Sequence, residues 1–188
     1  MDKISYGTDA ASKFVTNVGL ITSADPHGDN IMAAEWTNHV SYSPSLLSVH
    51  VGKGKATEGN IKASGEFGVS LAAADQNVVS SVAGRFTGKE VDKIAVLKAL
   101  GFGFYKAKKI KVLMVEGAAL NIECKVVKVV ELGDHTMFVG EAIEATASEK
   151  EPLLYHGGKY FEVGKRIEKP TKDYLEKIDE LAEGNPKN

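Results

Sequence analysis

The chain has 188 residues, and 23 Lys and Arg against 25 Asp and Glu leave a formal net charge of −2 at pH 7. With 43% hydrophobic and 26% charged residues, it has the composition of one ordinary soluble globular domain. No apolar run approaches the ~20 residues of a membrane span, and the near-neutral charge offers no basic surface to nucleic acid. The single cysteine, Cys124, excludes a disulfide framework, a Cys-ligated zinc site and an iron–sulfur cluster held by this chain. One free cysteine and no apolar signal segment near the start predict a cytoplasmic protein.

The N-terminal half has the pattern of short strands separated by turns. Phe14–Ser23 is rich in β-branched and apolar residues and ends at a cluster of Asp, Pro, Gly and Asn that favours a turn. Met32–Val40 follows as a second run, so the two runs predict a hairpin. Leu46–Gly52 alternates apolar and polar residues, as a half-buried strand does, and Phe67–Leu71 predicts another short strand.

Short helices are predicted between these strands. Thr57 is expected to cap a brief helix, because its hydroxyl can accept from free backbone N–H groups. Asp75 is a candidate cap for a helix over 76–83, which would stop at Gly84. Val91–Leu100 places its apolar residues near one helical face and predicts a further helix.

The second half returns to strands. Residues 120–126 alternate apolar and polar side chains, and the alternation breaks phase at Val126–Val127, which predicts a bulge or strong bend. Gly133–Asp134 is a hairpin turn signal, and Met137–Thr146 is its returning strand. Two long, sharply bent strands joined in this way are what a small barrel requires.

Taken together, the elements predict a mainly β protein, a β-barrel or split barrel with helical insertions. The whole chain, 1–188, is expected to be a single domain that ends in a helix at about 171–183. The apolar stripe of that helix consists of Tyr174, Leu175, Ile178, Leu181 and Ala182.

Few residues signal chemistry by themselves. The five histidines are scattered without the i, i+4 spacing of a zinc site, so no metal site is predicted. Cys124 sits on the apolar side of a strand pattern and is interpreted as a buried, inert thiol.

Three segments are compositionally unusual. Met32–Asn38 joins small residues to the only Trp, which favours a flat ligand against the backbone or, alternatively, a core Trp beside tightly packed strands. Gly52–Asn60 and Ala83–Glu90 combine Gly, Thr and basic residues. Such loops suit an anion such as phosphate, especially at a helix N-terminus, although solvated loops have the same composition.

The order of these segments resembles that of a known family, the flavin reductase-like proteins with an FMN-binding split barrel, over about Phe14–Gly164. The stretch NVGLITSADPHGDNIMAAEWTNHVSYSP and the GKGKATEGNI that follows its next strand resemble the family's N-terminal block. GDHTMFVGEAIE and PLLYHGGKYFEVG resemble two later signatures. Small FMN-binding proteins and flavoredoxins have similar patterns.

The resemblance implies a site for FMN, whose ring would lie along the strand that contains the Trp. The residues that it assigns to the cofactor are Ala34, Glu35, Trp36, Thr37, Gly52, Lys53, Thr57, Asn60, Gly84, Arg85 and Lys89. His135 would position a nicotinamide, and His156 and Tyr160 would contribute from the closing segment. Many relatives have Ser at the position of Glu35, whose carboxylate would either lower the flavin potential or face solvent.

The implied function is an FMN-binding oxidoreductase, a flavin reductase that takes hydride from NADH or NADPH and passes electrons onward. One alternative is a flavoredoxin-like electron-transfer protein whose FMN is reduced by a partner protein. Another is a split barrel that binds no flavin. The resemblance further implies a homodimer, with a monooxygenase or another redox protein as the electron acceptor.

Overall fold

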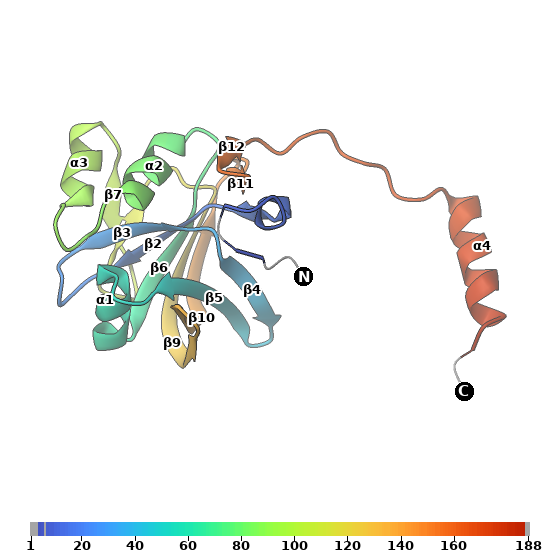
Figure 1. Cartoon of the computed structure of the whole chain (residues 1–188), viewed down its shortest axis with the longest axis horizontal. Helices are drawn as coiled ribbons and strands as arrows, with labels where there is room; N and C mark the ends of the chain where they lie inside the picture. The colour runs from blue at the N-terminus through green and yellow to red at the C-terminus, as the bar shows by residue number, and fades with distance from the viewer. Residues whose placement is uncertain (1–3, 6, 187–188) are drawn as a thin grey trace.

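The computed structural model describes residues 4, 5 and 7–186, and it confirms the predicted mainly β architecture with helical insertions (Figure 1). One antiparallel sheet contains, in spatial order, β3 (Asn30–Ala34), β2 (Gly19–Ser23), β6 (Glu66–Leu71), β9 (Leu120–Leu132), β10 (His135–Ala147), β5 (Ser45–Gly52) and β4 (Thr37–Tyr42). Smaller sheets pair β1 (Val15–Asn17) with β11 (Leu154–His156) and β12 (Lys159–Phe161), and β7 (Phe104–Lys106) with β8 (Leu113–Val115). The helices are η1 (Ala11–Lys13), α1 (Ala56–Ser64), α2 (Asn77–Arg85), α3 (Lys93–Ala99) and α4 (Lys172–Glu183).

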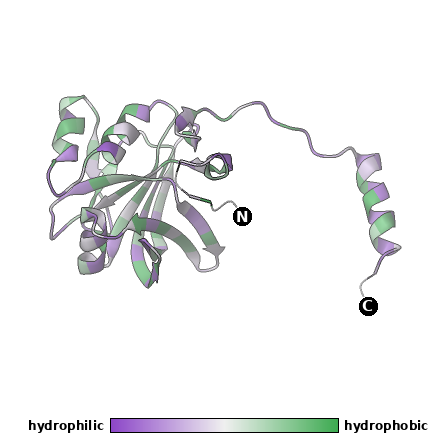
Figure 2. Cartoon of the chain, viewed as in Figure 1, coloured by the Kyte–Doolittle hydropathy of each residue, from purple (hydrophilic) through white to green (hydrophobic). Residues whose placement is uncertain are grey.

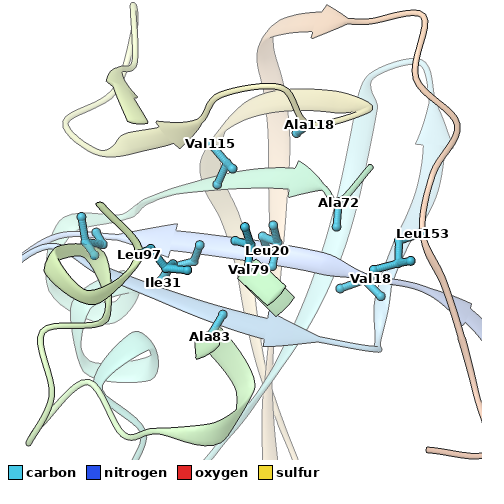
Figure 3. Packing of buried hydrophobic residues seen from close by; sticks show 11 residues of the cluster. Val18, Leu20, Ile31, Ala72, Val79, Ala83, Leu97, Val115, Ala118 and Leu153 are labelled. Atoms are coloured by element: carbon cyan, nitrogen blue, oxygen red, sulfur yellow. The ribbon is translucent and has the colours of Figure 1, made fainter. Parts of the chain in front are cut away.

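Strand β2 is buried along its whole length because both of its faces carry a hydrophobic core. Leu20 packs with α2 and α3 side chains such as Val79 and Leu97 on one face of the sheet (Figure 3). Its neighbour Ile21 belongs to a second cluster, which includes the fully buried Phe67 of β6. The sheet therefore separates a helix-covered core from the barrel interior.

The predicted hairpin is present, since β2 pairs with β3 in antiparallel register. The returning run, however, is split into β3 and β4 by Glu35 and Trp36. The Thr37 hydroxyl donates to the Ala34 carbonyl across this break, and its side chain occupies the space that a Cβ at Gly19 would need. The small residue opposite Ala34 thus permits a sharp bend that hydrophobic pattern alone does not reveal.

The long hairpin of β9 and β10 contains the predicted bulge. The pairing jumps from Val139↔Lys128 to Gly140↔Val126, so Val127 is the extra residue. Gly140 lies so close to Phe67 and Cys124 that a side chain would collide with both. Cys124 is fully buried, and burial raises the pKa of its thiol to about 12, which confirms the interpretation of an inert cysteine.

The helices are present, but two predicted caps are wrong. Helix α1 starts at Ala56 with Lys55 in the cap position, so Thr57 lies inside the first turn. Helix α2 starts at Asn77, after Gln76, and continues through Gly84 instead of stopping there, so Asp75 is no cap. Asp92 does cap α3, by accepting from the Ala95 N–H at 2.9 Å.

Helix α1 is fixed to its neighbours by the buried carboxylate of Glu58. This group accepts from the Gly54 N–H at 2.6 Å, from the Thr136 hydroxyl at 2.6 Å and from Lys62 at 2.9 Å. Burial opposes its ionisation, but the hydrogen bonds from Thr136, Lys62 and Gly54 outweigh that effect and lower its pKa to about 2. The carboxylate thereby joins α1, the loop before it and β10.

The C-terminal helix, predicted at about 171–183, is α4, and it stands apart from the rest of the chain at the end of an extended segment (Figure 1). Every residue from 161 to 186 is exposed. Among the described residues, no helix combines the length and the apolar character needed to cross a lipid bilayer.

The substitution Glu58→Gln should destabilise the fold by about 1–3 kcal/mol at neutral pH, because a charged acceptor of three hydrogen bonds is lost. A carboxyl with a lowered pKa stabilises the fold above its unfolded value of 4.5, and this contribution disappears as the pH falls toward 2. Denaturant unfolding of wild type and variant should therefore give a difference that shrinks across this interval. Asp75→Asn, at an exposed ion pair with Lys150 that does not contact the Glu58 network, is the control and should change little. A pH-independent difference would contradict the role given to the Glu58 charge.

Candidate functional site

A cavity of about 280 Å³ opens at the rim of the sheet, where β3 ends and α2 crosses it. Residues of β3 and α2 form one part of its lining, and residues of β11 and β12 in the small sheet form another. The lining residues are Val18, Ala33, Ala34, Glu35, Ser80, Ser81, Gly84, Tyr155 and Tyr160.

Small side chains form the floor of this cavity. A Cβ at Gly84 would lie 3.5 Å from the Cβ of Ala33, so α2 and β3 approach each other closely only because neither residue is large. Ala34 is buried beside them. Such a floor can admit a flat ligand against the backbone of β3.

Hydroxyl groups gather on the opposite side of the cavity. Tyr160 donates to Ser80 at 3.0 Å and lies 3.3 Å from the Ser81 hydroxyl, and its ring packs 5.5 Å from that of Tyr155. Ser80 and Gly84 are one helical turn apart and face the same space. This cluster offers donors and acceptors to the polar edge of a ligand.

Glu35 is among the residues that line the cavity, although the residue as a whole is exposed to solvent. Partial burial raises the pKa of its carboxyl above the usual range, because the charged form is partly shielded from water. The acidic group beside the cavity therefore takes up a proton more readily than a fully solvated glutamate.

At the start of β3, the two basic loops predicted from composition converge. Asn30 donates to the Thr57 hydroxyl at 2.8 Å, and the same amide lies against Gly88, where a side chain would collide with it. Thr57 is in the first turn of α1, and Gly88 is in the loop between α2 and α3. Asn30 and Ala34 are about 13 Å apart along an extended strand, so this polar end and the cavity floor share one strand.

Lys93 is the buried cation nearest to both regions. It is only 3% exposed, and its ammonium donates to the Ala83 carbonyl at 3.1 Å, one residue before Gly84. Burial, together with repulsion from Lys55 at the start of α1, lowers its pKa to about 8. Within the described part of the chain, no carboxylate lies within ion-pair distance of it. A bound anion would relieve the repulsion between these two lysines.

Trp36 is not a core residue, so that alternative is wrong: it is 49% exposed. Its ring packs 4.9 Å from that of His135 and 6.1 Å from that of His50. Asp134 lies 2.7 Å from Nδ1 of His135 and orients the imidazole. Burial and the proximity of His135 lower the pKa of His50. This aromatic cluster borders the Gly52 turn, not the cavity floor.

The other expected residues have varied surroundings. The side chain of Asn60 is engaged by the protein: it accepts from the His27 N–H and donates to Ser23 and Gly28. Lys53 pairs with Glu131 at 3.4 Å.

The guanidinium of Arg85 lies over Phe86, and Lys89 is exposed in the loop after α2. His156 lies 3.3 Å from the Phe14 carbonyl, whereas Tyr160 lines the cavity. The structure therefore brings Ala34, Glu35, Gly84 and Tyr160 to one cavity and Thr57 to the polar end beyond it.

Sequence reasoning missed Asn30, Lys93 and the serine pair of α2. The i, i+4 spacing of Ser80 and Gly84 is a signal that could have pointed to the cavity. Lys93 follows a helix cap in an amphipathic segment and carries no local sign of burial, and Asn30 stands in a turn-forming cluster. Both are recognised only from the fold.

Comparison with known proteins gives the family. The model of the flavin reductase like domain matches residues 11–164. A protein of Archaeoglobus fulgidus is 38% identical over 62% of this chain, and the match spans 64% of its own length. An NADH:FAD oxidoreductase of Streptomyces globisporus has a similar structure, with a TM-score of 0.75, 26% identity and coverage of 83% and 90% of the two chains. A flavoredoxin of Methanosarcina acetivorans gives a TM-score of 0.76 at 25% identity, covering 92% of this chain and 96% of the other. The chain belongs to the flavin reductase-like family.

Proposed function

We propose that the protein binds FMN across the cavity and the polar end of β3, and that it reduces this flavin with NADH or NADPH. The observation that carries the proposal is that the two regions share β3 and α2. The small residues of the cavity floor lie on this strand and this helix, and Lys93, which donates to Ala83 of the same helix, is buried with no carboxylate partner among the described residues.

The residues present fit this cofactor. Ala33, Ala34 and Gly84 leave room for a flat ring, and the hydroxyls of Ser80 and Tyr160 face its polar atoms. At about 280 Å³, the cavity is slightly below the range of about 300–1,000 Å³ common for cofactor sites. That small volume suits a site completed by a second subunit.

The polar end fits a phosphate. Lys93 and Lys55 repel each other there, and a dianion between them would relieve that repulsion. Thr57 and Asn30 fix the start of α1 beside the loop before α3. The N-terminus of α1 adds the favourable end of its helix dipole.

When bound, FMN accepts a hydride from a nicotinamide and passes the electrons onward. The protein itself positions the flavin and excludes water from one side of it. Ala33 and Gly84 set how closely the ring approaches β3, and Lys93 anchors the opposite end. His135, oriented by Asp134, is proposed to position the nicotinamide beside Trp36. The remaining proposed contacts are those of Thr37, Gly52, Lys53, Asn60, Arg85 and Lys89.

We infer a homodimer from the incomplete cavity and from the exposed aromatic cluster around Trp36. The electron acceptor is proposed to be a monooxygenase or another redox protein. A buried, unpaired Cys124 and the use of NAD(P)H favour the cytoplasm.

The function is tested first by an absorption spectrum of the purified protein with added FMN, followed by NADH and NADPH under anaerobic conditions. Bound flavin bands that bleach with a pyridine nucleotide are expected. Bands that bleach only with a reduced protein partner would favour an electron-transfer role, which the flavoredoxin likeness supports. A protein that binds no FMN would overturn the proposed site.

The cavity floor is tested at Gly84. Gly84→Ala should leave FMN affinity nearly unchanged, because the added methyl meets Ala33 at an ordinary contact distance of 3.5 Å. Gly84→Phe should weaken FMN binding by about 100-fold or more, since the ring would fill the cavity. Quenching of FMN fluorescence measures both affinities, and the thermal midpoint checks that both variants fold. Equal affinity of the two variants would place the flavin elsewhere.

The polar end is tested by pH. The phosphate of FMN is mostly a dianion above a pKa of about 6, and Lys93 is fully charged only below its pKa of about 8. FMN affinity should therefore decrease as the pH rises above 8, by at most about tenfold per pH unit for one linked proton.

Lys93→Met should bind FMN more weakly at neutral pH and lose this alkaline dependence. Lys98→Met, at an exposed lysine of the same helix, is the matched control and should behave as wild type. An unchanged affinity and pH profile in Lys93→Met would remove the lysine from the phosphate site.

A further inference from the structure

The C-terminal segment is the part of the structure that the proposed reaction does not use. It lies beyond the family match, which ends at residue 164. After β12 the chain runs outward in an extended stretch and ends in α4, well separated from the sheets (Figure 1). In this arrangement α4 does not pack on its own core, since all of its residues are exposed.

Helix α4 is nonetheless built to pack against something. Apolar and polar residues alternate along it in bands (Figure 2). Leu175 and Ile178 are 45% and 43% exposed, and Tyr174 and Leu181 extend the same face. The other face carries most of the five acidic residues and two lysines of the helix. A helix of 12 residues is marginal alone in water, so this apolar face needs a surface to cover it.

The size of α4 limits which kind of surface can cover its apolar face. The helix is about 18 Å long, so its apolar face is far smaller than the about 800 Å² per partner of a stable interface. It cannot hold an unrelated protein by itself, but it can extend a larger contact that already exists. Two identical copies supply such a contact and, by two-fold symmetry, place two arms in it.

The same chain also has an exposed strand edge that carries two large apolar side chains. Strand β4 is the last strand of the large sheet and leaves one edge unpaired there. Tyr42 is 89% exposed and Val40 is also exposed. Covering such an edge with a helix is a common protection against uncontrolled strand pairing. β4 begins directly after the cavity residues Ala34 and Glu35, so an arm placed on it would lie beside the site.

We propose that α4 packs its apolar face against the edge strand β4 of a second copy of this chain, so that two copies exchange their C-terminal arms. The proposal rests on the homodimer inferred above but not on flavin binding. In this arrangement the arm stabilises the dimer and lies next to the cofactor cavity of the other subunit.

The contribution of the arm is measured on the full-length protein without FMN, by sedimentation over a range of concentrations. The double variant Leu175→Ser and Ile178→Ser should raise the dimer dissociation constant by about tenfold or more. Glu176→Ser with Lys177→Ser, on the polar face, is the matched control and should leave it unchanged. A wild-type monomer would overturn the homodimer and the arm together. A dimer equally tight in the apolar-face variant would overturn the arm alone.

The acceptor is identified by cross-linking. The native Cys124 is fully buried, so introduced cysteines report without interference. Tyr42→Cys and Ile178→Cys are made in separate chains of different mass, mixed and oxidised. A disulfide-linked heterodimer is expected. Absence of a link between the chains would overturn β4 as the acceptor, and a link formed only within one chain carrying both cysteines would show that the arm folds onto its own barrel.

Discussion

The burial of β2 on both faces is the constraint on which the rest of the structure depends. Leu20 requires a helical cover on one side of the strand, and Ile21 requires the second hydrophobic cluster, inside the split barrel, on the other. Because one five-residue strand must be buried on both faces, the distance at which α2 and α3 pack over the sheet is fixed. The cavity forms where that cover reaches the end of β3, and its depth is set by the contact of Gly84 with Ala33.

At the polar end of the site, a charged lysine side chain is buried. Lys93 is buried near Lys55, and among the described residues its ammonium donates only to the Ala83 carbonyl, which is unfavourable for a charged group. Part of the unfavourable free energy of burying the ammonium is offset because the carbonyl belongs to the last turn of α2, where the helix dipole favours a cation. A bound anion would offset the remainder of this free energy. The same lysine thus stabilises a helix end and belongs to the phosphate site proposed above.

Most strand positions were predictable from the sequence because alternation directly reflects which face is buried, and the bulge at Val127 appeared as a break in that alternation. The single run predicted over Phe14–Ser23 was wrong, since it divides into β1 and β2, which belong to different sheets. Caps were less predictable. Thr57 and Asp75 have capping side chains, but the helix starts are set by how α1 and α2 pack, and Thr57 is instead bonded to Asn30, 27 positions away. The cavity also joins residues far apart in sequence. Local composition marked the segments Met32–Asn38 and Ala83–Glu90, but the assignment of Ala34, Glu35 and Gly84 to one site came from the family resemblance.

Glu35 is where this chain departs most clearly from the pattern that it resembles. A serine there would be neutral at any pH, whereas a carboxylate in the cavity opposes negative charge on a reduced ring. Burial already raises the pKa of Glu35, and a developing negative charge nearby would raise it further. The residue would then take up a proton as the flavin gains electrons, which cancels the repulsion. With FMN in the proposed site, Glu35 would thus couple the flavin potential to pH instead of simply lowering it, through one side chain at the bend between β3 and β4.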